Sequence, residues 1–330
     1  SMASNQAAAL RGADFATQWK NRLIFAVCYI ALFVVANILS GGAFFGRVNM
    51  ISVLSHAVYY GMVGFGMAFV MTAGIVDMSM GANVLLSANV GAFCAMNLGL
   101  GYVGLVVGAV ICAAVLELFT VFIGLRLQIP SWIAGLSMAL LYEGMLTLYS
   151  NYLSATQGTA AIFMDGFNAL GRMPGVVIVW LVAFVVCYYI YNFTTIGINI
   201  RALGCNGSVA QAMGIRRNRT LLIGAVICGI FLGLGAVVLM SMNKRVVALA
   251  GMNSISQIFK SLATFLLASS FSRIIGVPVG LLLASLFIAV LFNFMTLMGV
   301  PSGTGQEIML GAIVILCGVI SMLNHKGVVK

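Results

Sequence analysis

Residues 23–39 read LIFAVCYIALFVVANIL, an apolar run without a charged side chain. A helix of about 20 apolar residues crosses the hydrocarbon core of a bilayer, and apolar runs of this kind recur along the chain. Of the 330 residues, 62% are hydrophobic and only 7% are charged, a composition typical of integral membrane proteins. Lipid cannot satisfy backbone polar groups and the alternation of a membrane barrel is missing, so the sequence predicts an all-α polytopic membrane protein.

The charges beside this run predict its orientation. Lys20 and Arg22 precede it directly, so the positive-inside rule predicts a cytoplasmic N-terminus. Nine further spans are expected at about residues 50–73, 80–98, 101–123, 129–149, 174–192, 220–241, 254–271, 275–298 and 304–323. With these ten transmembrane helices, eleven of the 16 Lys and Arg residues lie inside and four lie outside, which predicts that both termini are cytoplasmic. A nine-span or eleven-span chain would place the basic C-terminal tail outside, which the same rule disfavours.

One membrane domain is expected. It covers residues 20–325, between a cytoplasmic lead at residues 1–19 and a cytoplasmic tail at residues 326–330. The net charge of +10 does not indicate a nucleic-acid partner, because the cations are scattered between apolar runs and form no basic face. The seven cysteines are widely spaced without a CxxC pair, which favours apolar packing over a disulfide or a metal site.

The sequence carries no catalytic motif. It lacks the G-x-x-x-x-G-K-[ST] phosphate loop and the H-E-x-x-H zinc helix, so no catalytic residue, metal or bound cofactor is expected. Polar residues do lie within expected spans, namely Glu117, Glu143, Lys260, Asn293 and Glu307. An ionised side chain costs about 2.5 to 3.5 kcal/mol at the bilayer centre, so such groups usually face a bundle interior, a cavity or an interface. Two interpretations remain open, a solute path or side chains that reach the interface or pair to fix packing.

A polar break separates the second and third expected spans, and it reads Thr72-Ala-Gly-Ile-Val-Asp77-Met-Ser79-Met-Gly81. Its glycines permit a tight break, and Asp77 or Ser79 can cap the next helix by accepting its free N–H groups. Broken helices are also where membrane transporters build binding sites. The stretch therefore predicts either a helix cap or part of a binding site.

A short basic island follows the sixth expected span. The expected cytoplasmic segment 193–219 contains Asn206-Gly-Ser-Val-Ala-Gln-Ala-Met-Gly214-Ile215, followed by Arg216, Arg217 and Arg219. Asn206 is a favourable N-cap, Ser208 to Met213 can form one or two helical turns, and Gly214 suits a left-handed C-cap. With the small Ala210 and Ala212, this helix would fit a groove on a partner protein. The alternative is an amphiphilic connector whose arginines bind the phosphates of membrane lipids.

Four stretches of the chain match motifs of one family. The first resembles T-x-G-I-D-L-S-V-G through Thr72, Gly74, Asp77, Ser79 and Gly81, and the second resembles L-x-I-P-x-x-I-A through Leu127, Ile129, Pro130, Ile133 and Ala134. The third resembles T-x-x-G-x-x-x-x-A-x-G-x-N-x-x-A-A-x-x-x-G-I through Thr194, Gly197, Ala202, Gly204, Asn206, Ala210, Gly214 and Ile215. The fourth resembles G-V-x-N-x-x-x-x-x-G-V in the stretch Val290-Leu-Phe-Asn293 to Gly299-Val300. In this order, they resemble the membrane permease subunits of ribose-type ABC importers, which carry sugars, polyols, nucleosides or autoinducer signals.

The resemblance implies a permease subunit of an ABC importer in the bacterial inner membrane, which forms the translocation path for a sugar or sugar-like solute. Partner ATP-binding cassette subunits would bind ATP, and an extracytoplasmic solute-binding protein and a second permease subunit, identical or different, would complete the importer. The resemblance assigns coupling to the ATPase to Asn206, Gly207, Ser208, Ala210, Ala212, Gly214 and Ile215. The residues expected to line the translocation path are Asp77, Ser79, Asn293 and Lys260.

The chain departs from the family in two places. Val76 is an additional residue in the first motif, and the family's E-L-D-x-I-A-A-V-V-x-G-G stretch is replaced by residues 253–270. The second departure removes an acidic pair and a double glycine, so it bears on the solute and on whether the two permease subunits are identical. The competing function is a secondary transporter driven by protons or sodium ions, with Glu143 or Glu307 as the ion carrier.

Overall fold

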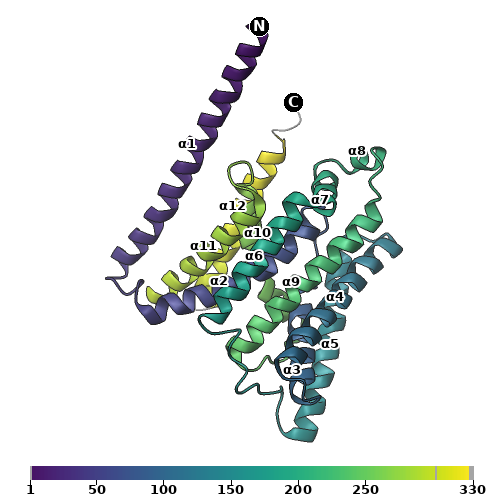
Figure 1. Ribbon diagram of the computed structural model, residues 1–330. Helices are drawn as coiled ribbons and strands as arrows, with labels where there is room; N and C mark the ends of the chain where they lie inside the picture. Colours follow the sequence, from purple (N-terminus) through teal and green to yellow (C-terminus); the bar gives the residue numbers. More distant parts are fainter. Residues whose placement is uncertain (1, 302, 327–330) are drawn as a thin grey trace.

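A computed structural model describes residues 2–301 and 303–326, and all the regular secondary structure in these residues is helical (Figure 1). This confirms the predicted all-α fold. The helices are α1 (Met2–Leu39), α2 (Arg47–Met71), α3 (Met80–Met96), α4 (Gly101–Leu127), α5 (Ser131–Gln157), α6 (Gly175–Phe193), α7 (Thr195–Cys205), α8 (Gly207–Ala212), α9 (Arg217–Asn243), the 3₁₀ helix η1 (Asn253–Ile255), α10 (Ser256–Ser270), α11 (Val277–Leu297) and α12 (Thr304–Lys326). Residues 327–330 of the expected tail lie outside the described residues.

Seven helices within the described ranges are long and apolar enough to cross a membrane: α1 from Thr17 onward, α2, α4, α5, α6, α9 and α11. Two shorter apolar helices, α3 and residues Thr304–Ile320 of α12, coincide with two more predicted spans. The span predicted at residues 254–271 differs. Its helix α10 has 15 residues and rises about 22 Å, which is less than the thickness of the hydrocarbon core. The polar residues before it form η1 instead of a first turn of α-helix.

The central helix of the bundle is α9, which packs against α2, α3 and α4. Gly229 and Gly233 lie one turn apart on α9, and both face α4. A Cβ atom at Gly229 would clash with the backbone of Ala114, and one at Gly233 would lie 2.5 Å from the Cα atom of Val110. Small residues at this spacing allow two membrane helices to approach closely, so dispersion contacts between α4 and α9 stabilise the bundle.

Gly229→Ala should therefore destabilise the protein, although alanine is the better helix former. The added methyl group forces α9 away from α4, and overpacking of this kind costs about 1 to 3 kcal/mol. Gly144→Ala is the matched control, because Gly144 is also helical and has no neighbouring atom within 4 Å of the new Cβ. The melting temperature of the purified protein in detergent should fall for Gly229→Ala and hold or rise for Gly144→Ala. Equal melting temperatures for the two variants would contradict this packing.

Side chains on α5 and α3 hold the segment between α9 and α10 in place through hydrogen bonds. The carboxylate of Glu143 on α5 accepts hydrogen bonds from the backbone N–H groups of Met252 (2.9 Å) and Ser254 (2.8 Å). The side-chain amide of Asn89 on α3 donates to the carbonyl oxygen of Val246 at 3.1 Å. Both oxygen atoms of the buried Glu143 are thus engaged in holding the segment that contains η1.

Candidate functional site

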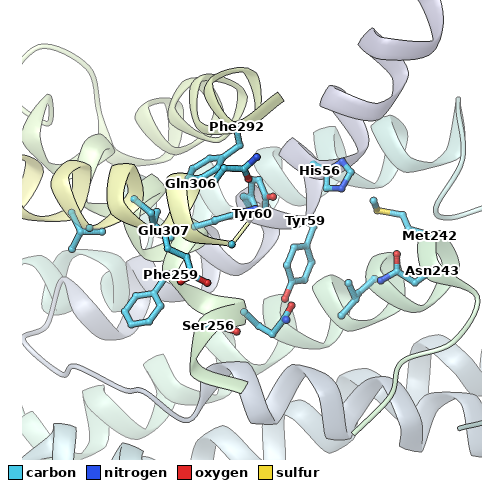
Figure 2. Close-up of a pocket in the computed structure, with 17 residues that line it drawn as sticks. His56, Tyr59, Tyr60, Met242, Asn243, Ser256, Phe259, Phe292, Gln306 and Glu307 are labelled. Atoms are coloured by element: carbon cyan, nitrogen blue, oxygen red, sulfur yellow. The ribbon is translucent and has the colours of Figure 1, made fainter. Parts of the chain in front are cut away.

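A cavity of about 680 Å³ lies between α2, the end of α9, α10, α11 and the start of α12. Figure 2 shows the side chains around it, with Tyr59, Tyr60, Ser256, Phe259, Phe292 and Gln306 among them. Ligand sites for small molecules usually have volumes of about 300 to 1,000 Å³ and combine apolar walls with a few polar groups. We call this cavity the cleft.

Lys260 reaches the cleft from α10. Its ammonium group lies 4.5 Å from the ring centre of Phe292 on α11 and 5.8 Å from that of Tyr60 on α2. These are cation–π distances, so the two rings hold the charged end of Lys260 in place. The neighbouring Tyr59 is buried, and its hydroxyl group has no hydrogen-bond partner in the described part of the chain.

A smaller cavity of about 210 Å³ continues from the cleft, because both are lined by His56, Tyr60, Lys260, Phe292 and Gln306. Asn293 lines the smaller cavity. Its side-chain amide exchanges two hydrogen bonds with the amide of Asn49 at the start of α2, at 2.8 and 2.9 Å. Asn293 therefore also ties α11 to α2.

The polar groups of the cleft are mostly amides and hydroxyls. Asn243 and Gln257 contribute amides, and Ser256 contributes a hydroxyl that donates to the carbonyl of Asn253 at 2.6 Å. The amide of Gln306 donates to the hydroxyl oxygen of Thr296 at 2.9 Å. Groups of this kind can exchange hydrogen bonds with a polyhydroxylated solute, while the ring of Phe292 offers an apolar face.

The four residues predicted to line the path fall into two places. Lys260 and Asn293 come together at the smaller cavity beside the cleft, whereas Asp77 and Ser79 are buried at the break before α3. The Asp77 carboxylate accepts a hydrogen bond from the backbone N–H of Ser79 at 2.6 Å, within the break itself, so it does not cap α3 as predicted. The Ser79 hydroxyl lies 3.3 Å from that of Thr120 on α4 and caps no helix.

Asp77 also lines a separate cavity of about 570 Å³, which includes Arg217 at the start of α9. The additional residue Val76 is accommodated at the break, where its backbone N–H donates to the hydroxyl of Ser131 at 3.1 Å. The break is thus tied to α5 as well as to α4.

The sequence did not predict that several of the side chains in the cleft line a cavity. Tyr59, Tyr60 and Phe292 lie within apolar runs, where aromatic residues are ordinary packing residues, and nothing in the pattern separates a ring that faces a cavity from one that faces lipid. Gln306 lies at the start of α12, in a stretch whose other residues suggest a helix end. The one available signal was that His56, Tyr59 and Tyr60 place polar atoms in the middle of α2.

The predicted short helix is present as α8, and its capping is confirmed. The side chain of Asn206 accepts a hydrogen bond from the backbone N–H of Val209 at 3.2 Å. Gly214 has a φ of +92°, the left-handed conformation expected after the helix, and Ile215 N–H donates to the carbonyl of Ala210 at 3.1 Å. The preceding helix α7, which begins after the cap residue Thr194, was not predicted.

The surface of α8 differs from the prediction in one respect. Ala210 is buried at 3% exposure, so the expectation that it faces a partner is wrong. Val209 and Met213 are the exposed apolar residues, at 52% and 79%, and Arg216 and Arg217 are exposed beside them. A partner would thus meet two apolar side chains bordered by cations.

The sequence is similar to those of known membrane transport proteins. The family described as branched-chain amino acid transport system / permease component matches residues 49–318. The ribose import permease protein of Escherichia coli strain K12 is 28% identical over 303 residues, which cover 88% of this chain and 91% of that protein. The galactose/methyl galactoside import permease protein of the same strain is 24% identical and covers 96% of this chain and 98% of that protein. The fructose import permease protein of Rhizobium meliloti is 25% identical over 218 residues, which cover 60% of this chain and 58% of that protein.

The matched region begins in α2 and ends in α12, so it includes every helix that lines the cleft as well as α7 and α8. The chain therefore belongs to the family of permease components of branched-chain amino acid transport systems.

Proposed function

We propose that this chain is the transmembrane subunit of a bacterial ABC importer and that it forms the path for a sugar or a sugar-like solute. The relatives named above support a sugar, since they are named for ribose, galactose and fructose. The amides, hydroxyls and aromatic rings of the cleft fit the same class of solute.

The observation that carries this proposal is the course of α9. Its first residue, Arg217, follows α8, and its last residue, Asn243, lines the cleft (Figure 1). With 27 residues, α9 is about 40 Å long, which is enough to connect the two sides of a membrane. In the proposed mechanism, movement of α8 is transmitted along the central helix α9 to the cleft.

In the proposed topology, ten crossings leave both termini and α8 in the cytoplasm. The irregular segment 244–255 followed by α10 makes the eighth crossing, which explains how a helix of 15 residues can take part. The cleft then opens toward the external half of the membrane. The loop after α5, where Asp165 forms a 3.3 Å ion pair with Lys244, would face the solute-binding protein.

The partners follow from this arrangement. The sequence has no phosphate loop, so ATP would be bound by two ATP-binding cassette subunits that contact α8 through Val209 and Met213. Asn206 and Gly214 shape that helix, and a second permease subunit would enclose the path beside Lys260 and Asn293. Asp77 and Ser79 would fix the start of α3 without contacting the solute.

Co-purification tests the proposal. The tagged chain, expressed with candidate ATPase subunits, should pull them down in a stable complex. In proteoliposomes, addition of a solute-loaded binding protein should raise the rate of ATP hydrolysis by roughly tenfold, which corresponds to a fall of about 1.4 kcal/mol in the activation free energy. A chain that binds no ATPase subunit, or hydrolysis that ignores the binding protein, would contradict the proposal.

A further inference from the structure

We propose that the solute of this permease carries a negative charge, a carboxylate or a phosphate group on a sugar, and that Lys260 recognises it. This inference rests on the proposed function and specifies its solute. It starts from a cation placed in the wall of a solute-sized cavity.

Two aromatic rings position the ammonium group of Lys260, but no described carboxylate pairs with its charge. Its ammonium group lies over the rings of Phe292 and Tyr60 and forms no ion pair with any described residue, while Lys244 does pair with Asp165. Glu307 on α12 is the carboxylate in the lining of the cleft, and it is exposed and makes no ion pair with Lys260. The aromatic rings orient the cation and leave its hydrogen-bond donors available.

An unpaired cation in a partly buried site is costly, because a charge removed from water needs a counter-charge or hydrogen bonds. A neutral polyol does not require such a group, since hydroxyls and amides are sufficient to bind it. An anionic group on the solute supplies the missing counter-charge. Ammonium groups bind carboxylates and phosphates through charge-assisted hydrogen bonds, which are the stronger class.

The rest of the cleft fits the remainder of such a solute. Tyr59 places at the same cavity a buried hydroxyl that has no hydrogen-bond partner among the described residues, so it can bond a sugar hydroxyl. Gln257 lies one turn before Lys260 on α10 and also lines the cleft. A volume of about 680 Å³ is ample for a monosaccharide with one anionic substituent.

The test compares three probes of one sugar in proteoliposomes that contain the complete importer: galactose, galacturonate and galactose 6-phosphate. ATP-dependent uptake of at least one anionic probe should show a KM roughly tenfold below that of galactose, and the two anionic probes distinguish a carboxylate from a phosphate. Lys260→Met should remove this preference, because it raises the KM of the anionic probe relative to the KM of galactose in the same variant. Lys260→Arg should retain the preference, because it retains the charge.

Lys20→Met is the control, since it makes the same change in net charge at an exposed position of α1. The melting temperature of each variant verifies that it is folded. ATP-dependent uptake of galactose with equal or weaker uptake of both anions would overturn the charge inference and leave the proposed function standing. A similar KM change in Lys20→Met and Lys260→Met would also overturn it. An assembled complex without ATP-dependent uptake of any probe would count against the proposed function as well.

Discussion

Glu143→Leu should destabilise the protein strongly and should abolish uptake. The carboxylate of Glu143 accepts hydrogen bonds from the N–H groups of Met252 and Ser254, and leucine leaves both without a partner. A buried donor that loses its partner costs about 1 to 3 kcal/mol, which applies to the N–H of Ser254, and the partly buried N–H of Met252 adds a smaller cost. The same change releases the segment that begins α10 and thereby displaces Lys260. The melting temperature in detergent measures the first effect, and uptake by the complete importer measures the second.

Two further variants sharpen this result. Glu143→Gln keeps one carbonyl oxygen as an acceptor, so it should retain part of the stability. Glu307→Leu removes an exposed carboxylate on α12 and should leave the melting temperature nearly unchanged. If Glu143→Leu melted like Glu307→Leu, the proposed anchoring of η1 would be wrong.

Met213→Asp should uncouple ATP hydrolysis from transport while leaving the chain folded. Met213 is 79% exposed at the end of α8, so its replacement removes nothing from the core. In an interface, a buried charge without a partner replaces an apolar contact, and loss of one central contact costs about 2 kcal/mol or more. ATP-driven uptake should therefore fall by roughly tenfold or more.

Met298→Asp is the matched control for this substitution. Met298 is 55% exposed at the end of α11, which lies on the opposite side of the proposed membrane from α8. Both variants should keep the melting temperature of the parent protein. Equal ATP-driven uptake in the Met213 and Met298 variants would remove the coupling role of α8.

The helices were largely predictable because long apolar runs permit little else in a membrane. The sequence correctly indicated α2, α4 and α9 to within a few residues, since each has a continuous apolar run with cations or glycines beside it. At α10 the predicted bounds, 254–271, also lie within two residues of the helix, but the sequence did not indicate that residues 253–255 form η1. The backbone N–H groups of Met252 and Ser254 donate to the Glu143 carboxylate on another helix, and pairings across 109 and 111 residues leave no local signal.

The candidate site was predictable only where a residue was unusual by itself. Placing the side chains of Lys260 and Asn293 in the hydrocarbon core costs free energy, so their polarity alone predicted that they face a cavity or an interface. The rings of Tyr60 and Phe292 carry no such mark, because their role depends on how α2, α10 and α11 pack. Capping of α8 depends on contacts within a few residues, so the sequence correctly identified Asn206 and Gly214 as its cap residues. The burial of Ala210 depends on tertiary packing, so the sequence did not indicate it.

The most direct test of the account is solute uptake into proteoliposomes with and without the ATPase subunits. The complete importer should take up sugar only when ATP is supplied on the side of α8, and a proton or sodium gradient without ATP should drive none. Vesicles that contain the permease chain without ATPase subunits should show no concentrative uptake under either condition. Uptake driven by an ion gradient in those vesicles would contradict the account and would identify the chain as a secondary transporter.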